Sequence, residues 1–301
     1  MGSLKEVRNR IVSVKSTQQI TKAMKMVSAA KLRRAQSRIM QMRPYAKKLK
    51  ELLANLSSSV EGSEAAAYFQ ERPQNKVLLV VITSDRGLAG SFNSSAIKEA
   101  LRAATSKYEK TKPENIDIVA IGKKSQNFFK KGRYKMIAEN TSIFSNLTYE
   151  NTEQIANMLI NAFLNHEYDA IDVIYNSFKN AAVYIPTLER FLPVAPPQME
   201  QKSKEETDKK QHHYVADYIF EPGQEEIVKR LIPQSLKVNL FRALLESNAA
   251  EHGARMTAMD KATDNAEDLI NQLKLKYNKE RQATITKEIL EIVGGAAALG
   301  G

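Results

Sequence analysis

An unbroken heptad pattern over residues 1–60 constrains the fold of this chain more than any other feature. Steps of three and four residues, taken alternately from Leu4, reach Val60 without a change of phase. Most of the positions reached are apolar: Leu4, Val7, Ile11, Val14, Leu32, Ala35, Ile39, Met42, Ala46, Leu49, Leu53, Leu56 and Val60. This repeat predicts one long helix that packs along a coiled-coil seam, with Pro44 as a point of expected irregularity.

The middle of this seam is polar. Its polar positions are Gln18, Thr21, Lys25 and Ser28. Over the same stretch apolar residues form a neighbouring stripe, namely Ile20, Ala23, Met24, Val27 and Ala30. Two interpretations fit this pattern. Either the seam rotates locally towards the stripe, or the helix relaxes its seam here and turns the stripe towards other proteins.

A second heptad pattern runs from about Gln224 to Leu299. Its seam is also apolar, then polar, then apolar: Val238, Phe241, Leu245, then Asn248, His252, Arg255, then Met259, Ala262, Ala266, Leu269 and Leu273. At about 1.5 Å per residue the two helices are roughly 90 and 110 Å long, too long for a domain of this size to bury. We therefore expect them to pair as an antiparallel coiled coil, with irregularities at Pro233 and Gly253.

The middle of the chain has the pattern of an α/β domain. Buried-strand patterns occupy residues 75–85, 116–122 and 170–178, and helical stretches near 94–110 and 150–165 separate them. This alternation predicts a Rossmann-like domain with a largely parallel sheet. The expected organisation is an N-terminal coiled-coil helix at 1–62, the α/β domain at 76–195, a linker and foot segment at 196–222, and a C-terminal coiled-coil helix at 223–301.

Positive charge is concentrated in the first helix. Residues 1–60 hold 14 Lys and Arg against two acidic residues, whereas the whole chain has a net charge of +11. One arm of the protein, and not its whole surface, therefore suits an anionic partner. The chain has no cysteine, which excludes disulfides and thiolate chemistry, and no apolar run long enough to span a membrane.

The sequence offers no convincing catalytic constellation. The turn at residues 83–93 contains Gly87 and Gly90, but it lacks the glycine spacing of dinucleotide and P-loop sites. It is either a phosphate cradle or, as we expect, a tight connection from strand to helix with Ser91 or Asn93 as N-cap. The four histidines, His166, His212, His213 and His252, do not form a metal-binding pattern. We expect neither a metal nor a cofactor.

The C-terminal end is unusually apolar for a helix terminus. Ile289, Leu290, Ile292 and Val293 are followed by alanines and Leu299. Exposed termini are rarely this apolar, so another protein is expected to cover this tip.

Four stretches together resemble the gamma subunit family of F-type ATP synthases. They are residues 19–36, 84–93, 251–266 and 277–299, and they occur in the family's order. The resemblance extends over nearly the whole chain. Ala89 and Ser91 depart from the Cys and Gly that the family often has there. The resemblance implies a rotor shaft without a catalytic site of its own. Such a shaft couples proton flow through a membrane ring to ATP synthesis or hydrolysis in beta subunits.

The same resemblance implies roles for particular residues. The positions expected to contact the ring of three alpha and three beta subunits are Lys22, Met24, Lys25, Arg33, Arg281, Gln282 and Thr286. The tip that turns in an apolar sleeve would include Ile289, Val293 and Leu299. A foot around Asp217 and Tyr218 would meet the epsilon subunit and the c-subunit ring.

The expected location is peripheral, at the cytoplasmic face of a bacterial inner membrane, because neither a transit peptide nor the chloroplast cysteine insertion is recognisable. Two other functions remain open from the residues alone. One is a basic coiled-coil protein that binds nucleic acid, although the basic arm lacks aromatic residues for stacking on bases. The other is an α/β enzyme that handles phosphate at the 83–93 turn.

Overall fold

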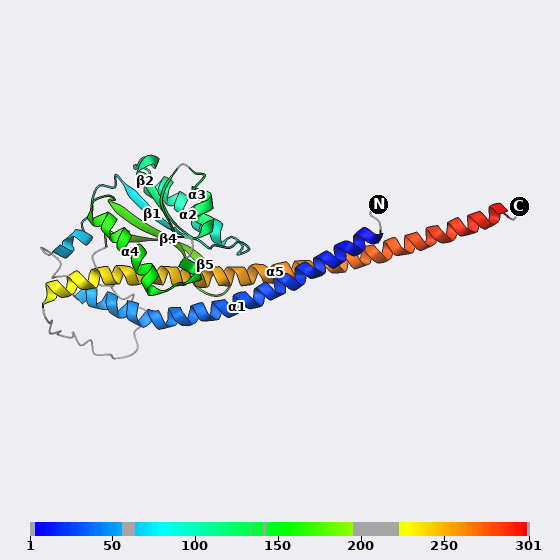
Figure 1. The fold of residues 1–301 in the computed structure, drawn as a ribbon, viewed down its shortest axis with the longest axis horizontal. Helices are drawn as coiled ribbons and strands as arrows, with labels where there is room; N and C mark the ends of the chain where they lie inside the picture. Colours follow the sequence, from blue (N-terminus) through cyan, green and yellow to red (C-terminus); the bar gives the residue numbers. More distant parts are fainter. Residues whose placement is uncertain (1–3, 56–63, 133, 141–142, 195–222, 300–301) are drawn as a thin grey trace, which may run out of the picture. The chain divides into compact units, whose positions relative to one another are not determined.

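Two long helices run through the chain in a computed structural model that describes residues 4–55, 64–132, 134–140, 143–194 and 223–299. They are α1 (Leu4–Asn55) and α5 (Gln224–Leu299), and both are drawn in Figure 1. The chain divides into two compact units. We call Met1–Lys31 with Arg255–Gly301 the helical unit, and Leu32–Ala254 the α/β unit. The helical backbone continues through Pro44 in α1 and through Pro233 and Gly253 in α5, where irregularities were expected.

The α/β unit is built on a sheet with the strand order β3-β2-β1-β4-β5. The strands are β1 (Val77–Ile82), β2 (Ile116–Ile121), β3 (Lys135–Asn140), β4 (Ala170–Phe178) and β5 (Tyr184–Leu192). The first four are parallel, and β5 pairs antiparallel with β4. The predicted α/β class with a largely parallel sheet is therefore confirmed.

Helices cover both faces of this sheet. They are α2 (Phe92–Arg102), α3 (Lys123–Phe129) and α4 (Tyr149–Leu164), and a π-helical turn, Ala103–Lys107, follows α2. Short 3₁₀ turns lie at Glu64–Tyr68, Pro113–Asn115 and Ile143–Ser145. Right-handed crossovers place α2 and α3 on one face, and the return from β3 to β4 places α4 on the other, beside α5 (Figure 1).

Two of the inner strands of the sheet are fully buried. Every residue of β1 and β2 is buried, which explains their nearly continuous apolar sequences. At the end of β2, Gly122 has φ of 97°, and a Cβ there would lie 2.2 Å from the Thr83 carbonyl oxygen. Only glycine fits where these two strand ends approach each other.

Two strands were not predicted, and both lie at sheet edges. In β3 exposed and half-buried residues alternate, so the strand has no continuous apolar run. In β5 the Pro186 ring interrupts the pattern, as an edge position allows. Within the described residues, no helix is both long and apolar enough to cross a membrane.

Candidate interaction surface and its supporting interior

The seam of the helical unit keeps its heptad phase through the polar stretch. Thr21 and Ser28 are buried, with 8% and 3% of their surface exposed. The Thr21 hydroxyl lies 2.8 Å from that of Thr263 in α5, and the Lys25 ammonium contacts the Asp260 carboxylate. Thr21 pairs with Thr263, and Lys25, later in α1, pairs with Asp260, earlier in α5. The two helices are therefore antiparallel, and the expected pairing is confirmed.

The neighbouring apolar stripe faces away from this seam. Ile20 and Val27 are 58% and 57% exposed, and Met26 beside them is 61% exposed. The interpretation of a locally rotated seam is wrong, because rotation would bury Ile20 and expose Thr21. The helices instead stay in contact through polar side chains, and the stripe forms an uncovered apolar strip on α1.

The residues expected to contact partners near this strip differ in their surroundings. Lys22 is exposed, whereas Met24 and Lys25 are half-buried, and Lys25 pairs within the chain with Asp260. Arg33 is exposed as well, but it belongs to the α/β unit.

A second candidate surface lies further along α5. Arg281, Gln282 and Thr286 are exposed, and the Thr286 hydroxyl donates a hydrogen bond to the Gln282 carbonyl at 2.9 Å. Arg281 lies 21 residues beyond Asp260 on one helix, so about 30 Å of helix axis separates it from the Lys25 contact. The structure therefore does not bring these two groups of predicted residues together.

The C-terminal turns of α5 expose large apolar side chains. Ile289, Leu290, Ile292 and Val293 are between 54% and 71% exposed. Helix α5 ends at Leu299. An uncovered apolar surface of this kind is typical of a protein-binding site. The predicted foot residues Asp217 and Tyr218 lie outside the described residues.

Two asparagines make hydrogen bonds within the chain at the crevice where doubly wound folds bind nucleotides. This crevice lies between β1 and β4, where the strand order reverses. Asn93 accepts hydrogen bonds from the Ser84 backbone N–H at 2.9 Å and from its hydroxyl at 3.0 Å. Asn176, fully buried, donates to the Phe92 carbonyl at 2.8 Å.

The 83–93 turn is thus a strand-to-helix connection with Ser91 as the N-cap residue of α2, as expected. Ser91 occupies the N-cap of α2 without a side-chain capping bond, and its hydroxyl instead contacts that of Tyr184 at 2.7 Å. Asn93 turns back to Ser84. The Ser84 backbone N–H, which could otherwise face a phosphate, is thus bound to Asn93.

A cluster of charged and polar groups joins β4 and β5 to α5. The Arg242 guanidinium donates two hydrogen bonds to Glu189, at 2.7 and 2.8 Å, and another to Glu246 at 3.2 Å. It also donates to the Tyr175 hydroxyl at 3.2 Å, and Ser177 donates to Glu246 at 2.7 Å. We call these five residues the Arg242 clamp.

Electrostatics keep the Arg242 clamp charged. Burial lowers the pKa of Arg242, but the charges of Glu189 and Glu246, together with the Tyr175 hydroxyl, raise it further, so the guanidinium stays protonated. Burial also raises the pKa of Tyr175, which remains a neutral donor to Glu189 at 2.9 Å. This cluster was not predicted from the sequence. Its one signal is an arginine and a glutamate four residues apart within an apolar seam.

A second cluster lies on the opposite face of the same hairpin. The fully buried Asp172 carboxylate accepts hydrogen bonds from Lys107 at 2.6 Å and from Arg190 at 2.7 Å. The Tyr108 hydroxyl also donates to Asp172, and burial is the main cause of its raised pKa. Asp172 is therefore balanced by two cations and serves to hold the end of α2 on the sheet.

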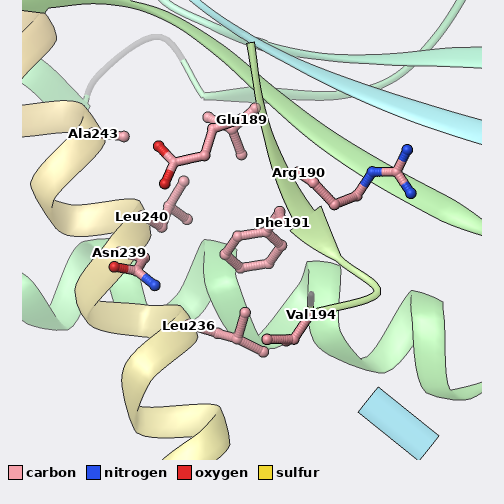
Figure 2. Close-up of a pocket in the computed structure, with 9 residues that line it drawn as sticks. Glu189, Arg190, Phe191, Val194, Leu236, Asn239, Leu240 and Ala243 are labelled. Atoms are coloured by element: carbon pink, nitrogen blue, oxygen red, sulfur yellow. The ribbon is translucent and has the colours of Figure 1, made fainter. Parts of the chain in front are cut away.

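A small hollow lies between β5 and α5 and is shown in Figure 2. Phe191, Val194, Leu236 and Leu240 line it, with Glu189 at its rim, and it encloses about 70 Å³. A nucleotide needs several hundred Å³. Among the described residues no three acidic or histidine side chains are grouped as metal ligands would be.

Comparisons with known proteins agree with one another. Residues 3–299 match the family model described as ATP synthase. The ATP synthase gamma chains of Flavobacterium johnsoniae and Cytophaga hutchinsonii are 55% and 52% identical to this chain; the alignments cover 100% and 99% of both sequences.

Solved structures give the same result for the fold. The central stalk and c-ring structure of Tetrahymena thermophila mitochondrial ATP synthase matches with a TM-score of 0.58 and 26% identity, over 81% of this chain and 99% of that chain. A chain of the Euglena gracilis mitochondrial enzyme in rotational state 3 matches with a TM-score of 0.64 and 18% identity, over 98% of this chain and 94% of that one.

Proposed function

This chain belongs to the gamma subunits of F-type ATP synthases, and from that membership we propose which of its surfaces meets which partner. As a gamma subunit it is the central rotor shaft of the enzyme and a non-catalytic part of it. Two alternatives were left open by the residues, a nucleic-acid-binding protein and an enzyme that handles phosphate. The relatives that match over the whole length are gamma chains, so they favour neither alternative.

The apolar end of α5 is the observation that carries the proposal. Ile289 and Val293 are 54% and 59% exposed, and large apolar side chains on a helix end require a cover. We assign that cover to an apolar sleeve formed by the alpha and beta subunits. Such a contact has few directional bonds, so it permits the shaft to turn. Leu299, at the end of the helix, belongs to the same tip.

The polar part of the proposed interface uses exposed cations and amides. Lys22 and Arg33 on α1 would face acidic loops of the beta subunits, beside the half-buried Met24 and Lys25. Arg281, Gln282 and Thr286 on α5 would donate hydrogen bonds to beta. Charge attraction acts over a Debye length of about 8 Å, so it tolerates a moving contact better than hydrogen bonds do.

The remaining partners are assigned to the α/β unit. We place the epsilon subunit and the c-subunit ring against it, together with a foot around Asp217 and Tyr218. The whole chain would then lie at the cytoplasmic face of the bacterial inner membrane, held there by the complex.

The coupling mechanism follows from asymmetry. A shaft made of two unequal helices has no threefold symmetry, so it presents a different face to each of three chemically identical beta subunits. The angle of the shaft therefore decides which site is open. By linkage, nucleotide binding and release bias the shaft angle in return. Proton flow that turns the shaft can therefore drive ATP synthesis without any contact between gamma and substrate.

Reconstitution tests this assignment. The full chain mixed with alpha and beta subunits should form a complex that hydrolyses ATP, and the chain alone should have no such activity. Arg281→Ala should lower the activity of the complex by about tenfold, the effect of losing a charged hydrogen bond worth roughly 1.5 kcal/mol. Lys276→Ala, a change at an exposed residue of the same helix, is the matched control.

Two outcomes contradict the proposal. One is a chain that does not assemble with alpha and beta. The other is an Arg281→Ala chain that unfolds more easily but, once assembled, works at the normal rate.

A further inference from the structure

The contact between α5 and the sheet is apolar over much of its area. Leu236, Leu240 and Ala243 of α5 line the hollow shown in Figure 2, opposite Phe191 of β5. Val173 of β4 also lines it. Apolar contacts are non-directional, and the hollow shows that packing here is incomplete. A helix held only in this way could roll about its own axis against the sheet at little cost.

The Arg242 clamp supplies directional hydrogen bonds, which the apolar packing lacks. The Nη2 of Arg242 donates to both carboxylate oxygens of Glu189, and its Nη1 donates to Tyr175 and Glu246. Charged bonds from both nitrogens to partners on three elements fix the plane of the guanidinium. One helical turn later, Glu246 accepts from Ser177 of β4. Arg242 and Glu246 also bond to each other, so α5 meets two strands at two successive turns.

A third contact lies further along the same stripe of α5. Gly253 follows Glu246 by seven residues, so it returns to the same helical face. A Cβ at Gly253 would lie 2.7 Å from the Ala181 carbonyl oxygen, in the turn that joins β4 to β5. The helix backbone therefore approaches this hairpin as closely as atoms allow.

We propose that Arg242 is a positioning residue that fixes the rotational angle of α5 on the α/β unit, so that the β4–β5 hairpin takes up the torque carried by α5. The helix is continuous from Gln224 to Leu299, so twist applied beyond residue 255 reaches residue 242 through its own hydrogen bonds. The proposal rests on the proposed function, in which the α/β unit meets the c-subunit ring and epsilon.

The test uses the whole membrane-bound enzyme. In inverted vesicles, the rate of ATP-driven proton pumping is divided by the rate of ATP hydrolysis, to give a coupling ratio. Arg242→Gln should leave hydrolysis unchanged and lower this ratio to about half or less, because a neutral amide cannot make the charged hydrogen bonds to Glu189 and Glu246. Arg242→Lys keeps the charge but has one donor nitrogen where the guanidinium uses two, so it should give an intermediate ratio.

Control variants separate torque from folding. Arg230→Gln removes an arginine that is 84% exposed and pairs with Glu226 on the same helix, so it should leave the ratio unchanged. Glu189→Gln should repeat the loss seen with Arg242→Gln, which keeps the test valid even if one variant folds poorly.

Because the chain has no cysteine, a covalent replacement of the clamp is also possible. Glu189→Cys combined with Arg242→Cys, in an enzyme without other reactive cysteines, should have a low ratio until a short bismaleimide bridges the pair and restores it.

Each outcome decides the matter. A normal coupling ratio for both Arg242→Gln and Glu189→Gln would overturn the proposal. Loss of assembly and hydrolysis in both, in proportion to pumping, would show that the clamp only supports folding and would overturn it too. If the unmodified chain itself assembles with alpha and beta but supports no pumping, the assignment of the α/β unit to the c ring fails instead.

Discussion

The helical unit and the α/β unit bury their side chains in different ways. In the α/β unit whole strands are buried, and the charges of Asp172 and Arg242 are enclosed in networks. In the helical unit α1 buries a single stripe, and its ion pair of Lys25 and Asp260 has side chains 40% and 46% exposed. The difference teaches that the α/β unit specifies its own geometry, whereas the helical unit leaves apolar surface for other proteins to cover.

The largest effect should come from breaking a buried network of the α/β unit. Asp172→Ala leaves Lys107, Arg190 and the Tyr108 hydroxyl without their shared acceptor, and should destabilise the unit by about 3–5 kcal/mol. Urea unfolding of the full chain, followed by circular dichroism, measures the change.

The matched control for Asp172→Ala is Glu99→Ala. Glu99 pairs with Arg102, whose side chain is 73% exposed, so its loss should cost no more than about 1 kcal/mol. If Asp172→Ala also costs less than about 1 kcal/mol, the enclosed charges of the α/β unit contribute no more to stability than exposed ion pairs do. The contrast with the helical unit would then be lost.

A change of intermediate size compares one residue type in both units. Gly253→Ala places a Cβ 2.7 Å from the Ala181 carbonyl oxygen and should cost about 1–3 kcal/mol. Gly294→Ala, where no atom lies within 4 Å, should stabilise the helix by up to about 1 kcal/mol. Thermal unfolding of both variants provides the comparison. Equal shifts of the melting temperature, with the same sign, would mean that the hairpin confines α5 at Gly253 no more than α5 is confined at Gly294.

The smallest effect should come from the outer stripe of α1. Val27→Gln, at a side chain that is 57% exposed, should change the stability of the isolated chain by less than about 0.5 kcal/mol. Val7→Gln, the same change at a seam position that is 5% exposed, should cost about 1–3 kcal/mol. Equilibrium unfolding distinguishes them, and a large loss for Val27→Gln would show that the stripe is internal after all.

Much of the fold could be predicted because it follows local periodicity. The seam positions from Val7 to Leu49 agree with the heptad, and even Thr21 and Ser28 lie where its phase places them. The direction of the seam in its polar stretch could not be predicted, because composition alone favours burying Ile20. The hydroxyl contact between Thr21 and Thr263 decides it, and that contact joins residues 242 positions apart.

The partner surface and the clamp differ in how far the sequence reveals them. Exposed isoleucines at a helix end, such as Ile289 and Ile292, can be recognised from the sequence because no seam remains to bury them. Glu189 and Arg242 cannot be paired in this way, since β5 was not predicted and their contact depends on the sheet. The family resemblance, which the comparisons confirm, predicted the role of rotor shaft. It did not indicate the contact between Glu189 and Arg242.

The alternation of side chains along β5 also protects the fold against error. Glu189 and Arg190 are neighbours in the chain but point to opposite faces of the sheet, one towards Arg242 and the other towards Asp172. If β5 paired with β4 one residue out of place, Arg190 would meet Arg242 and Glu189 would meet Asp172. Both encounters repel, so a misregistered hairpin is penalised on both faces at once. Two adjacent residues of opposite charge thus act as a check on strand pairing while the protein folds.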